Sequence, residues 1–256
     1  MKTNQSIRKI DVRAMTRRIT SRENAAFKEI VRIATSSRER KSKGATLLDG
    51  PHLVEAYSAS GRTAETIVVA EGALDKPEIR TLFDSAPARH RLLLPDKLFA
   101  EIAQVATPVG IAAVIATPAN PAPPDRLGDC LLLEALQDWG NVGSVLRSAA
   151  AAGVAQVFLS PGSVFAWSPK TLRAGQGAHF YLAIHEGVDL VSIARRHPGA
   201  ILATDAGAER SLYDVDLSGP VGWAFGNEGA GLSPALADAA RTRVRIPMPG
   251  QAESLN

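Results

Sequence analysis

Val221-Gly-Trp-Ala-Phe-Gly-Asn-Glu-Gly-Ala-Gly-Leu-Ser-Pro234 decides the fold, because it joins an apolar strand to a helix through a glycine-rich turn. Val221–Phe225 carries no charge, which is typical of a strand that is buried on both faces. A serine followed by proline is typical of a helix start. Strand and helix patterns alternate in this way through residues 130–246, so the sequence predicts an α/β domain with a mostly parallel sheet covered by helices.

The glycine-rich turn itself does not match the common nucleotide-binding loops. Gly226 and Gly231 have the spacing of a phosphate loop, but Leu232 stands where the lysine of such a loop belongs, which argues against Walker-type binding. A Rossmann fingerprint does not fit either, because no acidic residue follows in place. A purely structural turn explains the glycines, but it leaves Asn227 and Glu228 at the strand end unexplained.

Two further loops carry polar residues at the end of a predicted strand. Asn141-Val-Gly-Ser-Val-Leu-Arg147 lies after the apolar run that begins at Cys130, and Ile246-Pro-Met-Pro-Gly with Glu253-Ser-Leu-Asn256 lies after the last strand. Open α/β folds bind ligands outside the carboxyl ends of their strands. We therefore expect the three loops to converge on one site.

Each of these loops also has a simpler reading when taken alone. Asn141 suits a helix cap, which would need no function. Arg147 is harder to explain, because a guanidinium among Val, Leu, Ser and Ala needs an anionic partner such as a phosphate or a carboxylate. Pro247 and Pro249 remove two amide donors and force an irregular path, which leaves other backbone groups free to bind an adenine edge.

The first half predicts a smaller α/β unit. A helical pattern begins at Ile19, and Ser36–Gly44 is expected to form an exposed basic turn. Strands are then expected at 46–49, 65–70, 91–94 and 109–116, and helices at 51–58, 77–85 and 96–104. In the second half, strands are expected at 130–135, 155–159, 180–184, 200–204, 221–225 and 243–246, and helices at 142–152, 169–173, 188–196 and 234–240.

Four prolines within Pro118–Pro124 mark the boundary between the two halves, because such a segment favours an extended spacer. We predict a flexible basic leader over residues 1–18, a first domain over 19–117, a linker over 118–127 and a second domain over 128–256. An Arg-rich, acid-poor leader also fits an organelle transit peptide, an alternative that we rank lower.

Composition excludes several classes of protein. Mean hydropathy of -0.01 is a globular value, and no apolar run reaches the roughly 18 residues that a membrane span needs. Cys130 is the only cysteine, so there is no disulfide framework, and the five histidines lack the spacing of metal ligands. We expect a cytoplasmic protein that uses no metal and does not bind a membrane.

Positive charge is concentrated at the start of the chain. Residues 1–43 have a charge balance of +9, whereas the remainder of the chain is at -6. A basic segment on a mildly acidic body predicts binding to a polyanion, although a solvated helix face is an equally simple explanation. The candidate RNA contacts are Arg22, Arg38, Arg40, Lys41 and Lys43.

The three loops together resemble the sequence motifs of the SpoU/TrmH ribose methyltransferases of the knotted SPOUT superfamily. The order is Asn141 with Arg147, then Gly226-Asn-Glu-Gly-Ala-Gly-Leu-Ser233, then Ile246-Pro-Met with Ser254-Leu-Asn256. Asp49-Gly-Pro-His-Leu-Val-Glu-Ala and Thr107-Pro-Val-Gly-Ile-Ala are similar to the family's ribosomal-protein-like RNA-binding domain. The resemblance therefore covers nearly the whole chain from about residue 19.

The resemblance implies a fold, a reaction and a set of site residues. It implies a carboxyl-terminal domain with a deep trefoil knot, S-adenosylmethionine as cofactor, a homodimer, and methylation of a ribose 2′-hydroxyl in structured RNA, with ribosomal RNA favoured. It also implies a further helix beyond Asn256 that completes the knot. Matching positions give Asn141, Arg147, Glu228, Ser254 and Asn256 as the catalytic set, and Gly226, Ile246 and Leu255 as cofactor contacts.

Other functions stay open at this point. The alternatives within the same fold are a tRNA 2′-O-methyltransferase and a non-catalytic RNA-binding protein of ribosome assembly. The presence of all five predicted catalytic residues argues against the non-catalytic alternative. A nucleotide-dependent enzyme that uses the glycine-rich loop is disfavoured by Leu232. We expect Arg147 to clamp the phosphate and the 2′-oxygen and Glu228 to orient Arg147 or an arginine of a second copy, while the general base stays unassigned.

Overall fold

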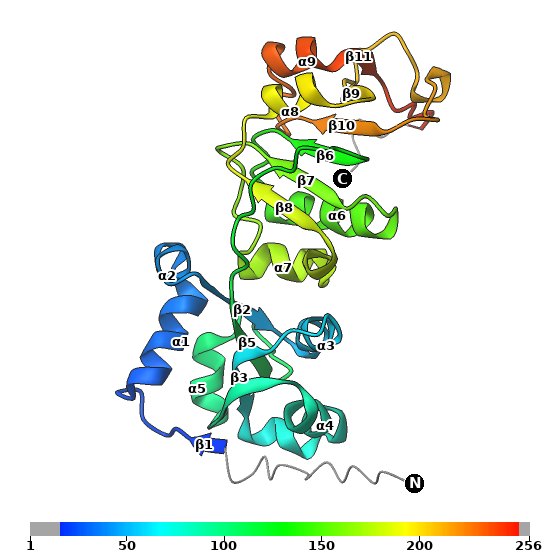
Figure 1. Ribbon diagram of the computed structural model, residues 1–256. Helices are drawn as coiled ribbons and strands as arrows, with labels where there is room; N and C mark the ends of the chain where they lie inside the picture. Colours follow the sequence, from blue (N-terminus) through cyan, green and yellow to red (C-terminus); the bar gives the residue numbers. More distant parts are fainter. Residues whose placement is uncertain (1–15, 251–256) are drawn as a thin grey trace, which may run out of the picture. The chain divides into compact units, whose positions relative to one another are not determined.

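The computed structural model describes residues 16–250 and divides the chain into two compact units, Met1–Ala116 and Thr117–Asn256 (Figure 1). Each unit has its own sheet with helices packed against it. Among the described residues, no helix has both the length and the apolar character that a membrane span requires.

The amino-terminal unit is built on a five-stranded mixed sheet in the order β1-β4-β3-β5-β2. The central strand β3 runs parallel to β4 and antiparallel to β5, and its Val68 and Val69 are fully buried. The strands are β1 (Thr16–Arg18), β2 (Ala45–Asp49), β3 (Ala64–Ala70), β4 (Ala88–Leu94) and β5 (Ile111–Ala116).

Two predictions for the start of this unit are wrong. Thr16–Arg18, assigned to the flexible leader, forms the edge strand β1 against β4. The first helix begins at Ala25 and not at Ile19, because the Asn24 side chain caps it by accepting hydrogen bonds from the amides of Ala26 and Phe27. The helices of this unit are α1 (Ala25–Thr35), α2 (Ser37–Lys43), α3 (Pro51–Ala59), α4 (Pro77–Ser85) and α5 (Asp96–Ile102), with the 3-10 helix η2 (Glu71–Asp75).

The segment predicted as an exposed basic turn is the helix α2. Its two ends are well defined: the Ser36 hydroxyl accepts the amide of Glu39, and Gly44 closes the helix in the left-handed conformation that suits glycine. The sequence Ser-Arg-Glu-Arg-Lys-Ser-Lys has no apolar residue to give a helical period. The prediction failed because the capping residues, not hydrophobic periodicity, define this helix.

The carboxyl-terminal unit has a six-stranded sheet in the order β11-β9-β10-β6-β7-β8, and every pair in it is parallel. The chain leaves the neighbouring strands β6 and β10 in opposite directions across the sheet, toward β7 and toward β11, so the strand order reverses between them. In open parallel sheets this reversal is where ligands bind, outside the carboxyl ends of the strands. The strands are β6 (Cys130–Leu133), β7 (Gln156–Leu159), β8 (Ala183–Glu186), β9 (Ala200–Thr204), β10 (Val221–Phe225) and β11 (Arg241–Val244).

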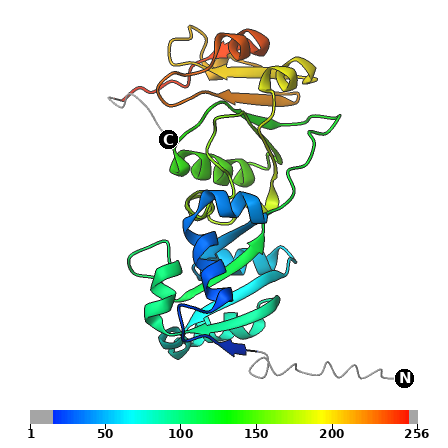
Figure 2. The same ribbon diagram turned by 90° about the vertical axis from the view of Figure 1, so that its left-hand side faces the viewer.

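Right-handed crossovers place the helices of this unit on both faces of the sheet. The connections β6–β7 and β7–β8 step across the sheet in one direction, so α6 and α7 lie on one face. The connections β8–β9 and β10–β11 step in the opposite direction, so α8 and α9 lie on the other face. Figure 2 shows α8 (yellow) and α9 (orange) together beside the strands. The helices are α6 (Trp139–Ala151), α7 (Pro169–Gly175), α8 (Leu190–Arg196) and α9 (Pro234–Ala240), with the 3-10 helices η3 (Ala178–Tyr181) and η4 (Leu212–Asp214).

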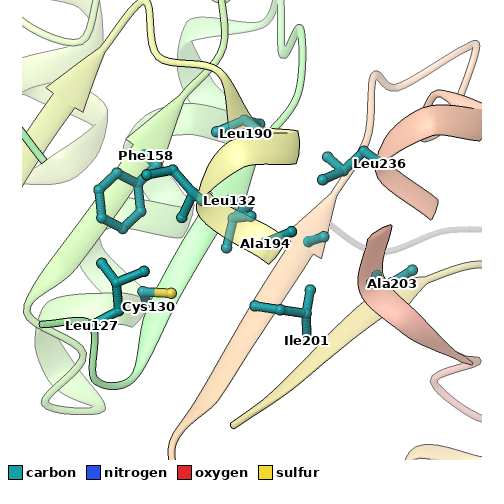
Figure 3. Close-up of a cluster of buried hydrophobic side chains, with 12 residues drawn as sticks. Leu127, Cys130, Leu132, Phe158, Leu190, Ala194, Ile201, Ala203 and Leu236 are labelled. Carbon is teal, nitrogen blue, oxygen red and sulfur yellow. The ribbon is translucent and has the colours of Figure 1, made fainter. Parts of the chain in front are cut away.

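The core between the sheet and α8 and α9 comes from alternate strand residues. Leu132, Phe158 and Ile201 point toward Leu190 of α8 and Leu236 of α9 (Figure 3). Burial of such aliphatic side chains contributes roughly 1.5–3 kcal/mol each. This packing holds the strand ends, and therefore the loops that follow them, in fixed positions.

Several element boundaries in this unit differ from the predictions by one to three residues, and the differences at η3, α8 and β11 are examples. Phe180 belongs to η3, and the strand after it begins only at Ala183. Helix α8 begins at Leu190 because Asp189 caps it. The last strand ends at Val244 and not at Ile246.

The proline-rich segment predicted as a spacer is fixed to the carboxyl-terminal unit by hydrogen bonds. Asn120 exchanges two hydrogen bonds with the backbone of Glu186, at 2.8 and 2.9 Å. Nδ1 of the buried His185 lies 2.9 Å from the Pro121 carbonyl, and Arg196 donates to the Pro124 carbonyl at 2.7 Å. The segment is extended, as its prolines require, but it lies along the unit.

Candidate functional site at the carboxyl edge of the second sheet

Glu228 joins the glycine-rich loop after β10 to the start of α6. Its two carboxylate oxygens accept the backbone amides of Gln137 and Asp138, both at 3.2 Å. The side-chain amide of Asn141 donates to the same carboxylate at 3.1 Å. Two of the three predicted loops therefore meet, and the contact is made by two of the residues predicted for the site.

These contacts correct the capping role suggested for Asn141 and identify the partners of Glu228. Asp138, not Asn141, caps α6, because its carboxylate accepts the Asn141 amide at 2.8 Å. Asn141 is the third helical residue, which frees its side chain to bind Glu228. The carboxylate of Glu228 was expected to orient Arg147 or an arginine of a second copy. Its hydrogen-bond partners within residues 16–250 are Asn141 and the backbone amides at the start of α6.

The charge on Glu228 is stabilised by these donors. Partial burial alone would raise the pKa of this carboxyl. Hydrogen bonds from its own backbone amide, the Asn141 side chain and the amides of Gln137 and Asp138 outweigh that effect and hold the pKa below its usual value. Glu228 is therefore ionised at neutral pH and is a weak proton acceptor.

The glycine-rich loop is a tight closed turn. Asn227 and Gly231 exchange backbone hydrogen bonds of 3.0 and 2.8 Å, and the Asn227 side chain accepts the amides of Gly229 and Ala230. A Cβ at Gly226 would lie 2.1 Å from the Gly231 carbonyl carbon. Position 226 therefore needs glycine because the loop folds back on it, a reason that the sequence does not reveal.

Glu134 is a site residue that sequence reasoning missed. It follows β6, and its carboxylate accepts both the backbone amide and the hydroxyl of Ser233, each at 2.7 Å. The preceding strand pairs with β10, and the Glu134 amide donates to the Phe225 carbonyl. A lone acidic residue at the end of an apolar strand was the only available signal.

Two cavities border the glycine-rich loop and share its Asn227, Ala230, Gly231 and Leu232. The larger cavity, about 860 Å³, is bounded by the residues after β6 and β7 and by the start of α8, including Glu134 and Ser160. The smaller cavity, about 400 Å³, is bounded by residues 203–206 at the end of β9 and just after it, by the loop, and by α9 and β11. Both volumes fall in the range of small-molecule sites.

Arg147 lies on the exposed side of α6. It makes no hydrogen bond or ion pair with any residue in the described range 16–250. The guanidinium predicted to need an anionic partner is thus open to solvent. This corrects its expected apolar surroundings and leaves its donors free for a ligand.

The third predicted loop is described only in part. The side chain of Ile246 is 43% exposed just after β11, and the Asp205 amide donates to the Val244 carbonyl at 2.9 Å. The start of this loop therefore lies next to the wall of the smaller cavity that follows β9. Ser254, Leu255 and Asn256 lie outside the described residues.

The basic residues predicted to bind RNA have different surroundings. Arg22 pairs with Glu101 and Lys43 with Glu29, both at 2.7 Å on the surface. Arg38 is exposed and makes no hydrogen bond or ion pair within residues 16–250, and Lys41 is exposed but does have an interaction partner.

Arg40 is the exception, because it is 9% exposed and donates to the Ile33 and Ala34 carbonyls at 2.8 and 3.2 Å. Its prediction as an RNA contact is wrong, since it closes the carboxyl end of α1.

No three His, Cys, Asp or Glu side chains gather as a metal site anywhere in residues 16–250. Cys130 is buried, and burial, helped by Asp129, raises the pKa of its thiol to about 12. This thiol is therefore a packing group. His179 is buried, and burial lowers its pKa to about 4 although the Ala166 carbonyl opposes the shift.

Comparisons with known families match both units. Residues 130–256 match the SpoU rRNA Methylase family, and residues 24–113 match the MRM3-like substrate binding domain. The chain is 31% identical to a 23S rRNA (guanosine-2′-O)-methyltransferase of Bacillus subtilis, a match that covers 94% of each chain. It is 30% identical to a 23S rRNA (uridine-2′-O)-methyltransferase of Streptomyces viridochromogenes, covering 94% of this chain and 87% of the relative.

Solved structures match over more than nine tenths of the chain as well. The crystal structure of an RNA 2′-O ribose methyltransferase has a TM-score of 0.77 at 32% identity, covering 94% of this chain and 93% of that one. The SpoU methyltransferase AviRb from Streptomyces viridochromogenes, in complex with the cofactor AdoMet, also has a TM-score of 0.77, at 26% identity over 91% and 92% of the two chains.

Proposed function

This chain belongs to the SpoU rRNA methylase family, and from that premise we propose that it transfers a methyl group from S-adenosylmethionine to a ribose 2′-hydroxyl of ribosomal RNA. The observation that carries the proposal is the joining of the glycine-rich loop to the start of α6 through Glu228 and Asn141. This contact sets two family motifs side by side at the sheet edge where ligands bind.

The smaller cavity fits the cofactor better than the larger one. Three strand ends meet there: Thr204 at the end of β9, the loop after β10, and Arg243 near the end of β11. Its walls carry small residues such as Ala203 and Ala237, so backbone groups are accessible to a ligand. Gly226, Ile246 and Leu255 would contact the cofactor mainly through their backbone, as the family resemblance implies.

Bound there, the cofactor supplies an electrophilic methyl group. The protein must then hold the ribose in line with that methyl group, because positioning accounts for a large part of such a barrier. The exposed guanidinium of Arg147 offers five N–H donors in a planar fork, which suits a phosphate and the 2′-oxygen. A guanidinium has N–H donors and no acceptor, so we assign Arg147 binding and charge stabilisation and not proton removal.

Glu228 acts as a positioning residue in this proposal. Its lowered pKa makes it a poor base, and its oxygens are already engaged by three donors. Its role is to fix the start of α6, and hence Arg147 further along that helix, relative to the cofactor loop. Ser254 and Asn256 complete the polar set by family resemblance.

The two units have different functions in this proposal. We propose that residues 19–117 bind the RNA substrate and that residues 128–256 catalyse the transfer, which agrees with the family matches to 24–113 and 130–256. A trefoil knot and a homodimer are part of the proposal, by resemblance to the SPOUT superfamily. Ribosomal RNA is favoured over tRNA because the relatives from Bacillus subtilis and Streptomyces viridochromogenes are named for 23S rRNA.

The proposal is tested by mapping 2′-O-methyl groups in ribosomal RNA from cells with and without the gene. We expect one modified position to disappear and to be restored by the purified protein with S-adenosylmethionine. Calorimetry should show cofactor binding that EDTA leaves unchanged. An unchanged methylation map together with no cofactor binding would contradict the proposal.

A further inference from the structure

Trp139, the first residue of α6, is an exposed aromatic residue beside the candidate site. Its side chain is 42% exposed, whereas Trp167 is buried and Trp223 is half-buried. A single exposed hydrophobic residue is common on protein surfaces and needs no explanation by itself. The surroundings of this one, however, point to a ligand.

The backbone around Trp139 is rigidly held. Glu228 accepts the amides of Gln137 and Asp138 on one side of it, and the Asp138 carboxylate accepts the Asn141 amide on the other. Both carboxylates are thus engaged by hydrogen-bond donors at the helix start. An aromatic ring mounted on such a backbone can bind with little loss of conformational entropy.

A lysine lies over the indole ring. Nζ of Lys170 is 4.2 Å from the ring centroid, a cation–π geometry. Lys170 makes no ion pair within residues 16–250 and is exposed to solvent. Its charge is therefore available to an anion next to the ring.

The tryptophan and the lysine come from two helices that are packed closely. Lys170 follows Pro169 at the start of α7, where Ser168 caps the helix by accepting the Thr171 amide. Gly143 of α6 allows the close approach, because a Cβ there would lie 2.4 Å from the Ala174 Cβ of α7. The packing of α6 against α7 therefore fixes the relative positions of the two backbone segments that carry the ring and the ammonium.

We propose that Trp139 and Lys170 form a platform for one unpaired base of the RNA, with the base stacked on the indole and its phosphate bound by the lysine. Stacking on aromatic side chains is a general way of binding single-stranded nucleic acid. The inference rests on the proposed function and narrows the substrate to RNA with an unpaired base next to the target.

The base on this platform belongs to a different nucleotide from the methylated one. Trp139 and Arg147 are eight residues apart on α6, which corresponds to a rise of about 12 Å. Successive nucleotides of a stacked strand are only about 3.4 Å apart. The ribose at Arg147 and the base at Trp139 are thus on different nucleotides, and the platform would select the sequence or shape flanking the target.

The test uses the full-length protein and ribosomal RNA purified from cells that lack the gene. Trp139→Ala should raise the KM for this RNA by about five- to hundredfold, the usual effect of losing one stacked base, whereas Trp139→Phe should keep most of the affinity. Lys170→Ala should raise KM less and should flatten its salt dependence. The matched control is Tyr181→Ala, an exposed aromatic residue before the amino end of β8, which should have no effect.

Fluorescence gives a readout that a merely structural role would not affect. RNA should quench the indole emission of the wild-type protein, and Trp139→Phe should abolish that quenching while cofactor binding is unchanged. If the wild-type protein methylates this RNA but Trp139→Ala has an unaltered KM, the platform is wrong and the proposed function stands. If Trp139→Ala turns a dimer into an inactive monomer in sedimentation, Trp139 is an interface residue, and the platform is again overturned. If the wild-type protein methylates no RNA, the proposed function itself fails.

Discussion

The side-chain amide of Asn141 donates a hydrogen bond of 3.1 Å to the carboxylate of Glu228, although 87 residues separate them in the sequence. The contact links the start of α6 to the loop after β10. It also places the charge of Glu228 next to the amino end of a helix, where the helix dipole favours an anion. One carboxylate therefore orders two of the three loops that surround the candidate site.

We expect Glu228 and Asn141 to be coupled energetically. Glu228→Ala should lower the free energy of unfolding by about 1 kcal/mol, because its hydrogen bonds are partly exposed to water. Asn141→Ala should cost a similar amount, and the double variant less than the sum, with a coupling of about 0.5 kcal/mol. Urea unfolding of the wild type, the two single variants and the double variant completes this double-mutant cycle. Strictly additive losses of unfolding free energy would show that the contact contributes nothing to stability.

Strands and helices with uniform hydrophobic patterns were predictable from the sequence. Ala200–Thr204 and Val221–Phe225 were predicted to the residue because they are uncharged and almost entirely apolar. Pro77–Ser85 was predicted to the residue because proline marks the start of its helix. By contrast, β1 is a three-residue edge strand with two exposed arginines, which resembles a flexible tail.

The candidate site was predictable in its residue types but not in its contacts. Asn141 and Glu228 belong to sequence motifs of the family, so the sequence indicates that they are site residues. Their hydrogen bond, and that between Glu134 and Ser233, depend on which strands are neighbours in the sheet. A parallel sheet brings together residues about 90 positions apart, and no local pattern encodes that register.

Arg38 and Arg40 are neighbours in sequence and should behave in opposite ways. Arg38→Ala should weaken RNA binding and lower the slope of log affinity against log salt by about one, because its charge is open to a phosphate. Arg40→Ala should lower stability by about 1–3 kcal/mol, because the Ile33 and Ala34 carbonyls lose their donor. Filter binding at several salt concentrations measures the effect of each variant on RNA affinity, and thermal melts measure its effect on stability. A reduced salt slope for a stable Arg40 variant would contradict the assignment.

The two cavities make the location of the cofactor testable. Ala206 and Pro161 are both exposed, and they line the smaller and the larger cavity respectively. Ala206→Phe should reduce S-adenosylmethionine affinity by at least tenfold by filling the smaller cavity, whereas the matched Pro161→Phe should leave it nearly unchanged. Calorimetry on the two folded variants decides, and the reverse result would place the cofactor in the larger cavity.

His179 should make the carboxyl-terminal unit sensitive to acid. Burial lowers its pKa to about 4, against 6.5 in the unfolded chain, so the unfolded state binds the proton more readily. The contribution to stability is fully present above pH 6.5 and is lost as the pH falls toward 4, with a total of about 3 kcal/mol. Urea unfolding across this range measures it.

His179→Gln should remove most of this acid dependence while lowering stability at pH 7, because glutamine does not titrate. The exposed His52→Gln in the other unit is the matched control and should keep the dependence of the parent protein. An acid response of His179→Gln that equals the parent's would assign the effect to other groups.

Arg147 gives the most direct test of the proposed chemistry. It is exposed and has no partner among residues 16–250, so Arg147→Ala should leave stability and cofactor affinity nearly unchanged. Single-turnover methyl transfer should fall by a factor on the order of a hundred, the usual scale for losing one transition-state electrostatic contact. Arg147→Lys should recover little, because a point charge does not replace a planar two-pronged donor. The matched control is Arg195→Ala, another exposed arginine without a partner in that range, on α8 at the opposite face of the sheet. An equal loss of methyl-transfer rate in both variants would mean that only the net charge of the protein matters. A near wild-type rate for Arg147→Ala would remove this residue from the site.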